Sequence, residues 1–145
     1  MSTIEVSAKY ALSQKVLFDL SQDMDQRLKW DKQTKELGFI GDYTRLETGA
    51  KVYTISKNNL KMDTEYIRFN PPNGIAIKMT SASVIFTSFT GEWRYTKLTE
   101  DQSQLSIIYT FNLKFPYNLI SFVVKKKLVN NAKKKLIDLK NYLHA

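Results

Sequence analysis

The side chains that most often perform catalysis or bind metal ions are scarce in this sequence. Its 145 residues include one histidine, His144, and no cysteine. Because His144 stands beside the C-terminus, where chains are usually frayed, a Ser-His-Asp triad is not expected. A metal site would need carboxylates alone, and the five glycines are scattered singly, without a phosphate-binding loop. The residues favour a binding protein over an enzyme, with no metal and no cofactor.

Two glutamates within strand-like segments could still act as a general acid or base on a bound ligand, because a cavity can shift the pKa of a carboxyl. Alternation along the strand places Glu92 on the same face as Arg94, pointing outward. Glu65 shares its face with Ile67 and Phe69, which is compatible with an inward position. Glu65 is therefore a candidate ligand-binding residue, with a solvent-facing or ion-paired carboxylate as the alternative.

The C-terminal region predicts one long helix over residues 118–143. Extending its apolar stripe toward the N-terminus reaches Ser121 and Lys125 in place of apolar residues. If both lie on the line that faces the rest of the protein, Lys125 would meet a carboxylate or phenolate of a ligand at the mouth of a cavity, unless it extends into water. Ser121, Lys125 and Leu128 are therefore candidate ligand-binding residues. The stripe recurs at three- and four-residue spacing through Leu128, Ala132, Leu136, Leu139 and Leu143.

The formal net charge of +8 is concentrated in this helix, because residues 118–145 contain seven lysines and one acid. Most of these lysines fall opposite the apolar stripe, which predicts a solvated helix face. Peripheral contact with an anionic membrane is the alternative. A nucleic acid partner is not expected, since the chain has four arginines and no recognised reading motif. The lysines opposite the stripe are Lys126, Lys127, Lys133, Lys134 and Lys140.

The remaining chain reads as strands joined by short turns. Residues 3–10 alternate between apolar and polar side chains, as a half-buried strand does. Ser13 is placed to cap a helix that ends near Asp23, and a second short helix follows over residues 25–30. Six further segments separated by turn residues predict an antiparallel meander. These segments are 37–44, 51–56, 62–69, 75–80, 86–96 and 105–114.

This order of elements resembles the helix-grip fold of the START-like (SRPBCC) superfamily, in particular its polyketide cyclase/dehydrase-like branch. The matching segments are Leu28-Lys29-Trp30-Asp31, Gly91-Glu92-Trp93-Arg94-Tyr95 and residues 105–111. The resemblance implies an α+β fold, with a seven-stranded curved antiparallel sheet around a long C-terminal helix and two short helices after the first strand. It also implies one ligand-binding domain over residues 1–145, with a cavity between sheet and helix.

Inward-facing apolar and aromatic side chains would line this cavity, although the same residues could form a solid core. Amphipathic members could also form a hydrogen bond with the polar end of a ligand. The expected function is binding or transport of a lipid, isoprenoid or polyketide-like molecule. A polyketide cyclase or dehydratase and a protein-interaction module like the chaperone activators are the alternatives, because fold does not determine function. The candidates on the sheet are Tyr53, Ile77, Met79, Phe89, Trp93, Tyr109 and Phe111.

The N-terminal segment does not have the character of a signal peptide. Polar residues occupy almost every second position of residues 1–10, whereas a signal peptide has a continuous apolar core. No stretch approaches the roughly 20 apolar residues of a membrane-spanning helix. A cytoplasmic location is therefore expected.

Overall fold

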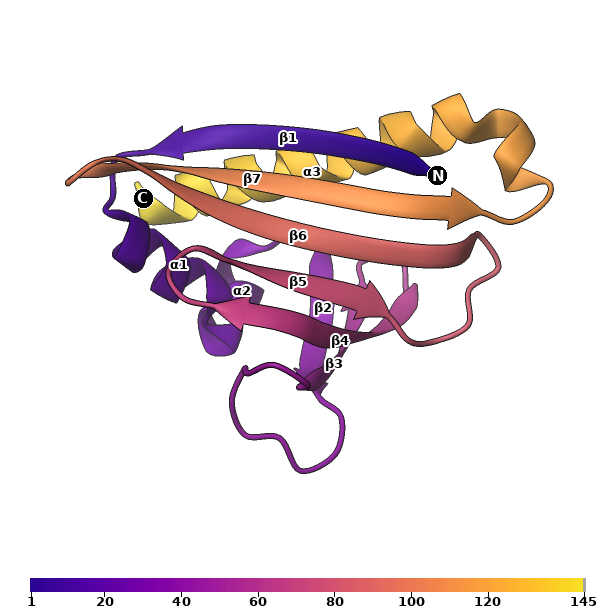
Figure 1. The fold of residues 1–145 in the computed structure, drawn as a ribbon, viewed down its shortest axis with the longest axis horizontal. Helices are drawn as coiled ribbons and strands as arrows, with labels where there is room; N and C mark the ends of the chain where they lie inside the picture. The colour runs from indigo at the N-terminus through magenta and orange to yellow at the C-terminus, as the bar shows by residue number, and fades with distance from the viewer. Residues whose placement is uncertain (145) are drawn as a thin grey trace.

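The chain folds into a curved, seven-stranded antiparallel sheet with a long helix across its open side (Figure 1). The computed structural model describes residues 1–144. The strands lie in the order β1-β7-β6-β5-β4-β3-β2, so that the first strand pairs with the last and β2 forms the other edge. Their bounds are β1 Ser2–Tyr10, β2 Thr34–Phe39, β3 Lys51–Ser56, β4 Lys61–Asn70, β5 Gly74–Met79, β6 Phe86–Thr99 and β7 Gln102–Leu113.

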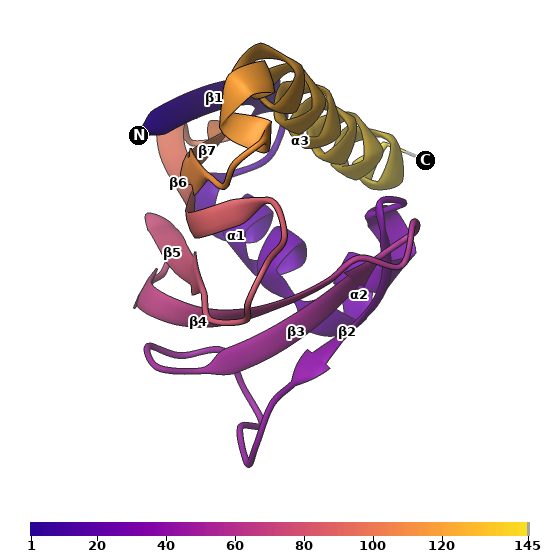
Figure 2. The same cartoon turned by 90° about the vertical axis from the view of Figure 1, so that its right-hand side faces the viewer.

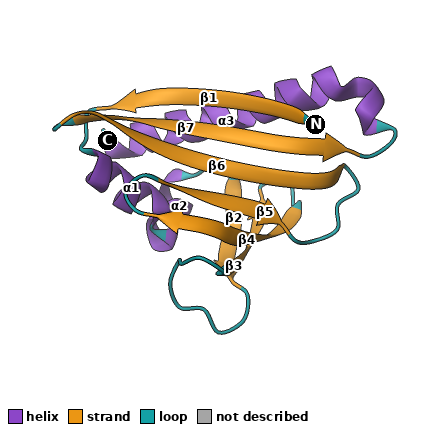
Figure 3. Ribbon diagram, viewed as in Figure 1, coloured by secondary structure: helices purple, strands orange, loops and turns teal. Residues whose placement is uncertain are grey.

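Two short helices connect the two edges of the sheet, as the sequence predicts. Helix α1 spans Gln14–Gln22 and begins at the cap residue Ser13, whose side chain accepts a hydrogen bond from the Val16 amide. Helix α2 spans Met24–Trp30 and is capped by Asp23. Figures 2 and 3 show both helices on the concave side of the sheet. No helix within residues 1–144 combines the length and the apolar character that crossing a membrane requires.

The C-terminal helix α3, Ser121–Leu143, packs its apolar stripe against β1 and β7. Ala132, Leu136 and Leu139 are buried in the core. The phenol of Tyr10, at the end of β1, donates a hydrogen bond of 2.8 Å to the Leu136 carbonyl oxygen and ties strand to helix. The lysines assigned to the opposite face are exposed. The helix-grip prediction is thus confirmed.

Several predicted boundaries were wrong. The segments predicted over 86–96 and 105–114 are longer at their shared turn, since β6 ends at Thr99 and β7 begins at Gln102. The strand expected over residues 37–44 is β2 Thr34–Phe39, and residues 40–50 form a loop. Gly41, with φ of +84°, turns the chain out of the sheet where the apolar pattern suggested continuation. The long helix begins at Ser121, because residues Tyr117–Ile120 after Pro116 form a 3-10 turn, η1.

The grip of α3 on the sheet can be tested by comparing two positions of this helix. Leu139 is 1% exposed and Ile137, on the outer face, is 56% exposed. We expect Leu139→Ala to lower the free energy of unfolding by about 2–4 kcal/mol, since it removes buried methyl groups and leaves a void. Ile137→Ala should change it by less than about 1 kcal/mol. Urea unfolding monitored by circular dichroism measures both, and equal losses would contradict this packing.

Candidate functional site

A cavity of about 520 Å³ lies between the inner face of the sheet and α3. This volume is within the range of small-molecule sites. Strands β2 to β7 contribute to its wall, together with residues of α1, α2 and α3, the turn between β3 and β4, and the loop of residues 81–85. Its apolar lining includes Val52, Ile75, Ile77, Met79, Phe89 and Leu128.

The cavity stays open partly because a glycine occupies an inward position in the middle of the sheet. Gly91 lies between Ile77 of β5 and Tyr109 of β7 in the strand register. A Cβ atom at Gly91 would lie 3.3 Å from both of these side chains. A larger residue would therefore push the Ile77 and Tyr109 side chains into the space that is now free.

Six of the predicted ligand-binding residues lie in the cavity wall. They come from four different elements, β5, β6, β7 and α3, which the fold brings together around one space. Their ordinary strand and helix alternation accounts for their positions. They are Ile77, Met79, Phe89, Trp93, Tyr109 and Leu128.

Three predicted residues on the sheet lie elsewhere. Tyr53 faces the outer side of β3, where its phenol donates a 3.4 Å hydrogen bond to Glu36. Glu65 follows the inward-facing Thr64 on β4, so its side chain lies on the outer face of the sheet. There it is paired in register with Lys51 of β3 and Lys78 of β5. Phe111 is 1% exposed and packs edge-on against Phe86, so that it fills the core instead of the cavity wall.

The first turns of α3 do not reach the cavity, which places Ser121 and Lys125 outside its wall. Leu128 is the first residue of α3 that lines the cavity. Figure 1 shows why, because the helix begins beyond the start of β1 and only its later turns cross the sheet. The basic residue of α3 in the cavity wall is Lys135, ten positions after Lys125.

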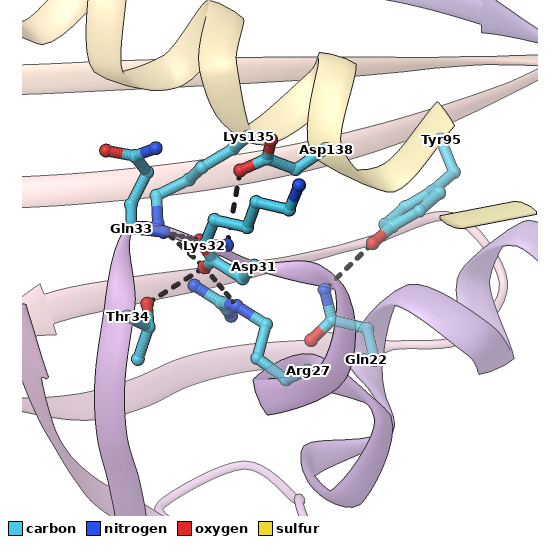
Figure 4. Close-up of polar contacts among 9 residues, drawn as sticks. All are labelled: Gln22, Arg27, Asp31, Lys32, Gln33, Thr34, Tyr95, Lys135 and Asp138. Atoms are coloured by element: carbon cyan, nitrogen blue, oxygen red, sulfur yellow. Dashed lines mark hydrogen bonds and ion pairs between the residues drawn. The ribbon is translucent and has the colours of Figure 1, made fainter. Parts of the chain in front are cut away.

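Lys135 belongs to a buried ionic cluster centred on Asp31 (Figure 4). The Asp31 side chain has no exposed surface, and its Oδ2 accepts from Arg27 Nε at 2.7 Å and Lys135 Nζ at 2.8 Å. Thr34 Oγ1 donates to the same oxygen at 2.9 Å, and the Gln33 amide donates to Oδ1 at 3.0 Å. One carboxylate thus joins α2, the start of β2 and α3.

The cluster changes the acidity of its members in opposite ways. Burial would raise the pKa of Asp31, but the adjacent charges of Arg27 and Lys135 outweigh it and hold the pKa well below its usual range. Burial and the repulsion of Arg27 lower the pKa of Lys135 to about 8, although Asp31 partly opposes them. Burial raises the pKa of Tyr109 in the cavity wall to about 12, so its phenol is neutral at physiological pH.

Arg27 is held in place by aromatic rings as well as by Asp31. Its guanidinium lies 5.4 Å from the ring centre of Trp30 and 5.0 Å from that of Trp93. Such cation–π contacts strengthen where water is excluded. Sequence reasoning missed Arg27, Asp31 and Lys135 as site residues, although Arg27 and Asp31 have the i,i+4 spacing of a helical ion pair.

A second hollow, of about 420 Å³, lies between α1, α2 and the loop after β2. It is more open, and its lining includes Asp19, Asp23, Asp25 and Arg45. Water can reach these charges, so the hollow lacks the apolar enclosure that a small hydrophobic ligand needs.

No family model and no curated protein sequence matches the chain. Solved structures do match the chain. A START superfamily protein from Mycobacterium smegmatis is 15% identical, with a TM-score of 0.79 over 97% of this chain and 98% of that chain. The chain has the START-like helix-grip fold.

Aromatase/cyclases share this fold. The Zhui aromatase/cyclase from Streptomyces sp. R1128 is 13% identical, with a TM-score of 0.81 over 97% of this chain and 92% of that chain. The di-domain aromatase/cyclase BexL from the BE-7585A biosynthetic pathway is 11% identical, with a TM-score of 0.81 over 99% of this chain and 47% of that chain. This chain therefore spans about half the length of BexL.

Asp31→Asn tests the buried cluster. The substitution leaves Arg27 and Lys135 close together without a counter-charge, so we expect the free energy of unfolding at pH 7 to fall by about 3–5 kcal/mol. The folded pKa of Asp31 lies below its unfolded value. The contribution of the Asp31 carboxylate to the free energy of unfolding of the wild type is thus present above about pH 4, and it is lost as the pH falls below that value.

Asp19→Asn is the matched control, because Asp19 is paired on the surface with Lys15 and its side chain is 55% exposed. Its effect should stay within about 0.5 kcal/mol. Urea unfolding from pH 7 down to pH 3 measures both variants. If Asp31→Asn is as stable as Asp19→Asn at pH 7, the charge of Asp31 does not stabilise the folded protein through this cluster.

Proposed function

We propose that the protein binds a small hydrophobic molecule in the cavity between the sheet and α3, and that residues 1–145 act as one ligand-binding domain that carries or senses this molecule. The observation that carries the proposal is the space of about 520 Å³ that apolar side chains from several elements line. Burying the apolar surface of a ligand there would supply the affinity. The START-like fold of a Mycobacterium smegmatis protein and of aromatase/cyclases supports the proposal.

An aromatase/cyclase-type reaction is the second candidate. Tyr66 and Tyr109 both line the cavity, and burial raises the pKa of each phenol. Neutral phenols can donate hydrogen bonds to a ligand carbonyl as charge develops on its oxygen. Conversion of a poly-β-ketone by the protein would favour this reaction over simple binding.

The binding proposal can be tested by filling the cavity. Ile77 lines the cavity and contacts the position of Gly91, whereas Ile67 on β4 is 42% exposed on the outside. We expect Ile77→Phe to weaken binding of the neutral fluorescent probe N-phenyl-1-naphthylamine by about tenfold or more, since the larger ring occupies ligand space. Ile67→Phe should leave the affinity unchanged. Fluorescence titration measures the affinity for the probe. Equal affinity of both variants would show that the probe binds outside the cavity.

We also propose that the end of the molecule where α3 begins contacts anionic membranes, from which a hydrophobic ligand could be collected. Phe115, Leu119 and Phe122 are 78%, 68% and 71% exposed. The exposed Lys126 and Lys127 follow them on α3. Exposed apolar side chains beside lysines suit a surface with anionic headgroups and an apolar interior.

The cavity-lining loop of residues 81–85 lies at the same end of the molecule (Figures 1 and 2). The Lys114 amide donates a 2.8 Å hydrogen bond to the Ile85 carbonyl oxygen and joins this loop to the segment before α3. Val84 of the loop is 76% exposed. Membrane contact at this end would therefore bring the cavity wall close to the lipid.

Vesicle co-sedimentation tests the membrane contact. We expect Phe122→Ser to reduce binding to phosphatidylcholine/phosphatidylglycerol vesicles several-fold, because it removes an exposed aromatic anchor. Ile137→Ser, on the exposed face near the other end of α3, is the control and should bind as the wild type does. Binding that is indifferent to vesicle charge, or equal losses in both variants, would contradict a specific contact.

A further inference from the structure

The charged residues that line the cavity all have the same sign. Arg27, Lys61 and Lys135 contribute to its wall, and among the lining residues within 1–144 there is no aspartate or glutamate. Lys61 also lies near Asp63 on the strand surface, and its side chain is 60% exposed. Arg27 and Lys135 are much less exposed, at 20% and 11% of their side chains. They are therefore the charges that a ligand would meet away from bulk water.

Asp31 cannot neutralise both of these cations. It carries one negative charge against two positive charges, and its Oδ2 already accepts hydrogen bonds from Arg27, Lys135 and Thr34. Its side chain has no exposed surface, so it lies behind the cavity wall. Asp138 of α3 also acts on Lys135, but neither carboxylate is among the lining residues, so the wall itself presents only positive charge to the cavity. Poor hydration makes a charge there costly unless an anion meets it.

Both cations also have unused hydrogen-bond donors. The Arg27 Nε donates to Asp31, but its two terminal nitrogens have no acceptor among residues 1–144. Lys135 Nζ has one acceptor there, Asp31, and an ammonium group has three donors. A guanidinium and an ammonium that share one carboxylate can thus bind a second oxyanion with charge-assisted hydrogen bonds.

The cations lie at one end of the apolar wall. Arg27 stacks over Trp93, and Trp93 lies beside Ile75 in the strand register. From Ile75 the wall continues along β5 through Ile77 to Met79, toward the loop of residues 81–85. At the usual rise of a strand, these positions span about 13 Å. The space has a cationic end and an apolar body.

We infer that the ligand is an amphipathic organic anion, whose acidic group meets Arg27 and Lys135 and whose apolar body extends along Ile75, Ile77 and Met79. This inference rests on the proposed binding function and specifies the ligand class. The acidic group meets the positive charge of the cavity wall, and the apolar body replaces water along the sheet. The neutral phenols of Tyr66 and Tyr109 add donors and no competing negative charge.

A pair of probes that differ in one charge tests the inference. N-phenyl-1-naphthylamine is neutral, and 1-anilinonaphthalene-8-sulfonate is the same skeleton with a sulfonate. We expect the wild type to bind the sulfonate more tightly. Lys135→Met keeps the neutral Arg27–Asp31 pair, and should weaken binding of the sulfonate about tenfold more than it weakens binding of the neutral probe.

Two further variants separate charge from packing. Lys134→Met removes an exposed lysine from the adjacent position and should change neither affinity. Lys135→Arg keeps the charge and should retain the preference for the sulfonate. A thermal melt confirms that each variant is folded. Equal losses of both probes in Lys135→Met, or equal affinity of both probes for the wild type, would overturn the inference.

The pH dependence gives an independent readout. Burial together with Arg27 of α2 lowers the pKa of Lys135 to about 8, and Asp31, directly after α2, and Asp138 of α3 partly oppose this shift. The sulfonate stays ionised, so its advantage over the neutral probe should decrease as the pH rises from 7 to 10 and Lys135 loses its proton. The advantage should not decrease in Lys135→Arg, and a decrease there would contradict the assignment.

If neither probe binds the wild type at any pH, the proposed binding function fails together with this inference, whereas neutral binding without charge preference overturns the inference alone.

Discussion

The position of α3 depends on the carboxylate of Asp31. Apolar packing of Leu136 and Leu139 fixes one side of the helix against β1 and β7. On the other side, the bond from Lys135 to Asp31 fixes it to α2 and the start of β2. The two attachments hold the helix across the curved sheet at a distance that leaves a space beneath it. Buried ionic groups add little stability relative to apolar packing, but they favour one arrangement over others.

The space beneath α3 results from an uneven distribution of large side chains on the inner face of the sheet. Phe86, Phe89 and Phe111 pack closely together at one end of the sheet. In the middle, the inward position of β6 is Gly91, whose missing side chain leaves room beside Ile77 and Tyr109. A cationic cluster at one end and apolar strands along the body make this space suited to an elongated molecule with one polar end.

Much of the fold could be predicted from sequence periodicity, because burial of one strand face or one helix stripe imposes a regular pattern. The exceptions have local causes. At Gly41 a positive φ ends a strand that hydrophobic alternation alone would extend. Ser121 and Lys125 continue the helical stripe, but the helix starts beyond the sheet, a geometric fact that spacing within one element does not contain.

The ionic cluster could be predicted only in fragments. Arg27 and Asp31 have helical ion-pair spacing, and Lys135 stands seven residues after Leu128 and four before Leu139, within the apolar stripe. That position suggests a buried lysine, since a lysine inside an apolar stripe needs a partner. Its partner is more than one hundred residues away and cannot be read from local spacing. The cavity-lining residues of the sheet were easier to predict, because strand alternation alone brings them to one face.

Native mass spectrometry of freshly purified protein tests the central claim, that the space between sheet and helix holds a small hydrophobic molecule. We expect a species heavier than the chain, from which solvent extraction releases an amphipathic organic acid, and we expect Ile77→Phe to lack this species. Protein that carries the mass of the chain alone, and that gains no mass when incubated with long-chain fatty acids, would contradict the claim and indicate a closed core.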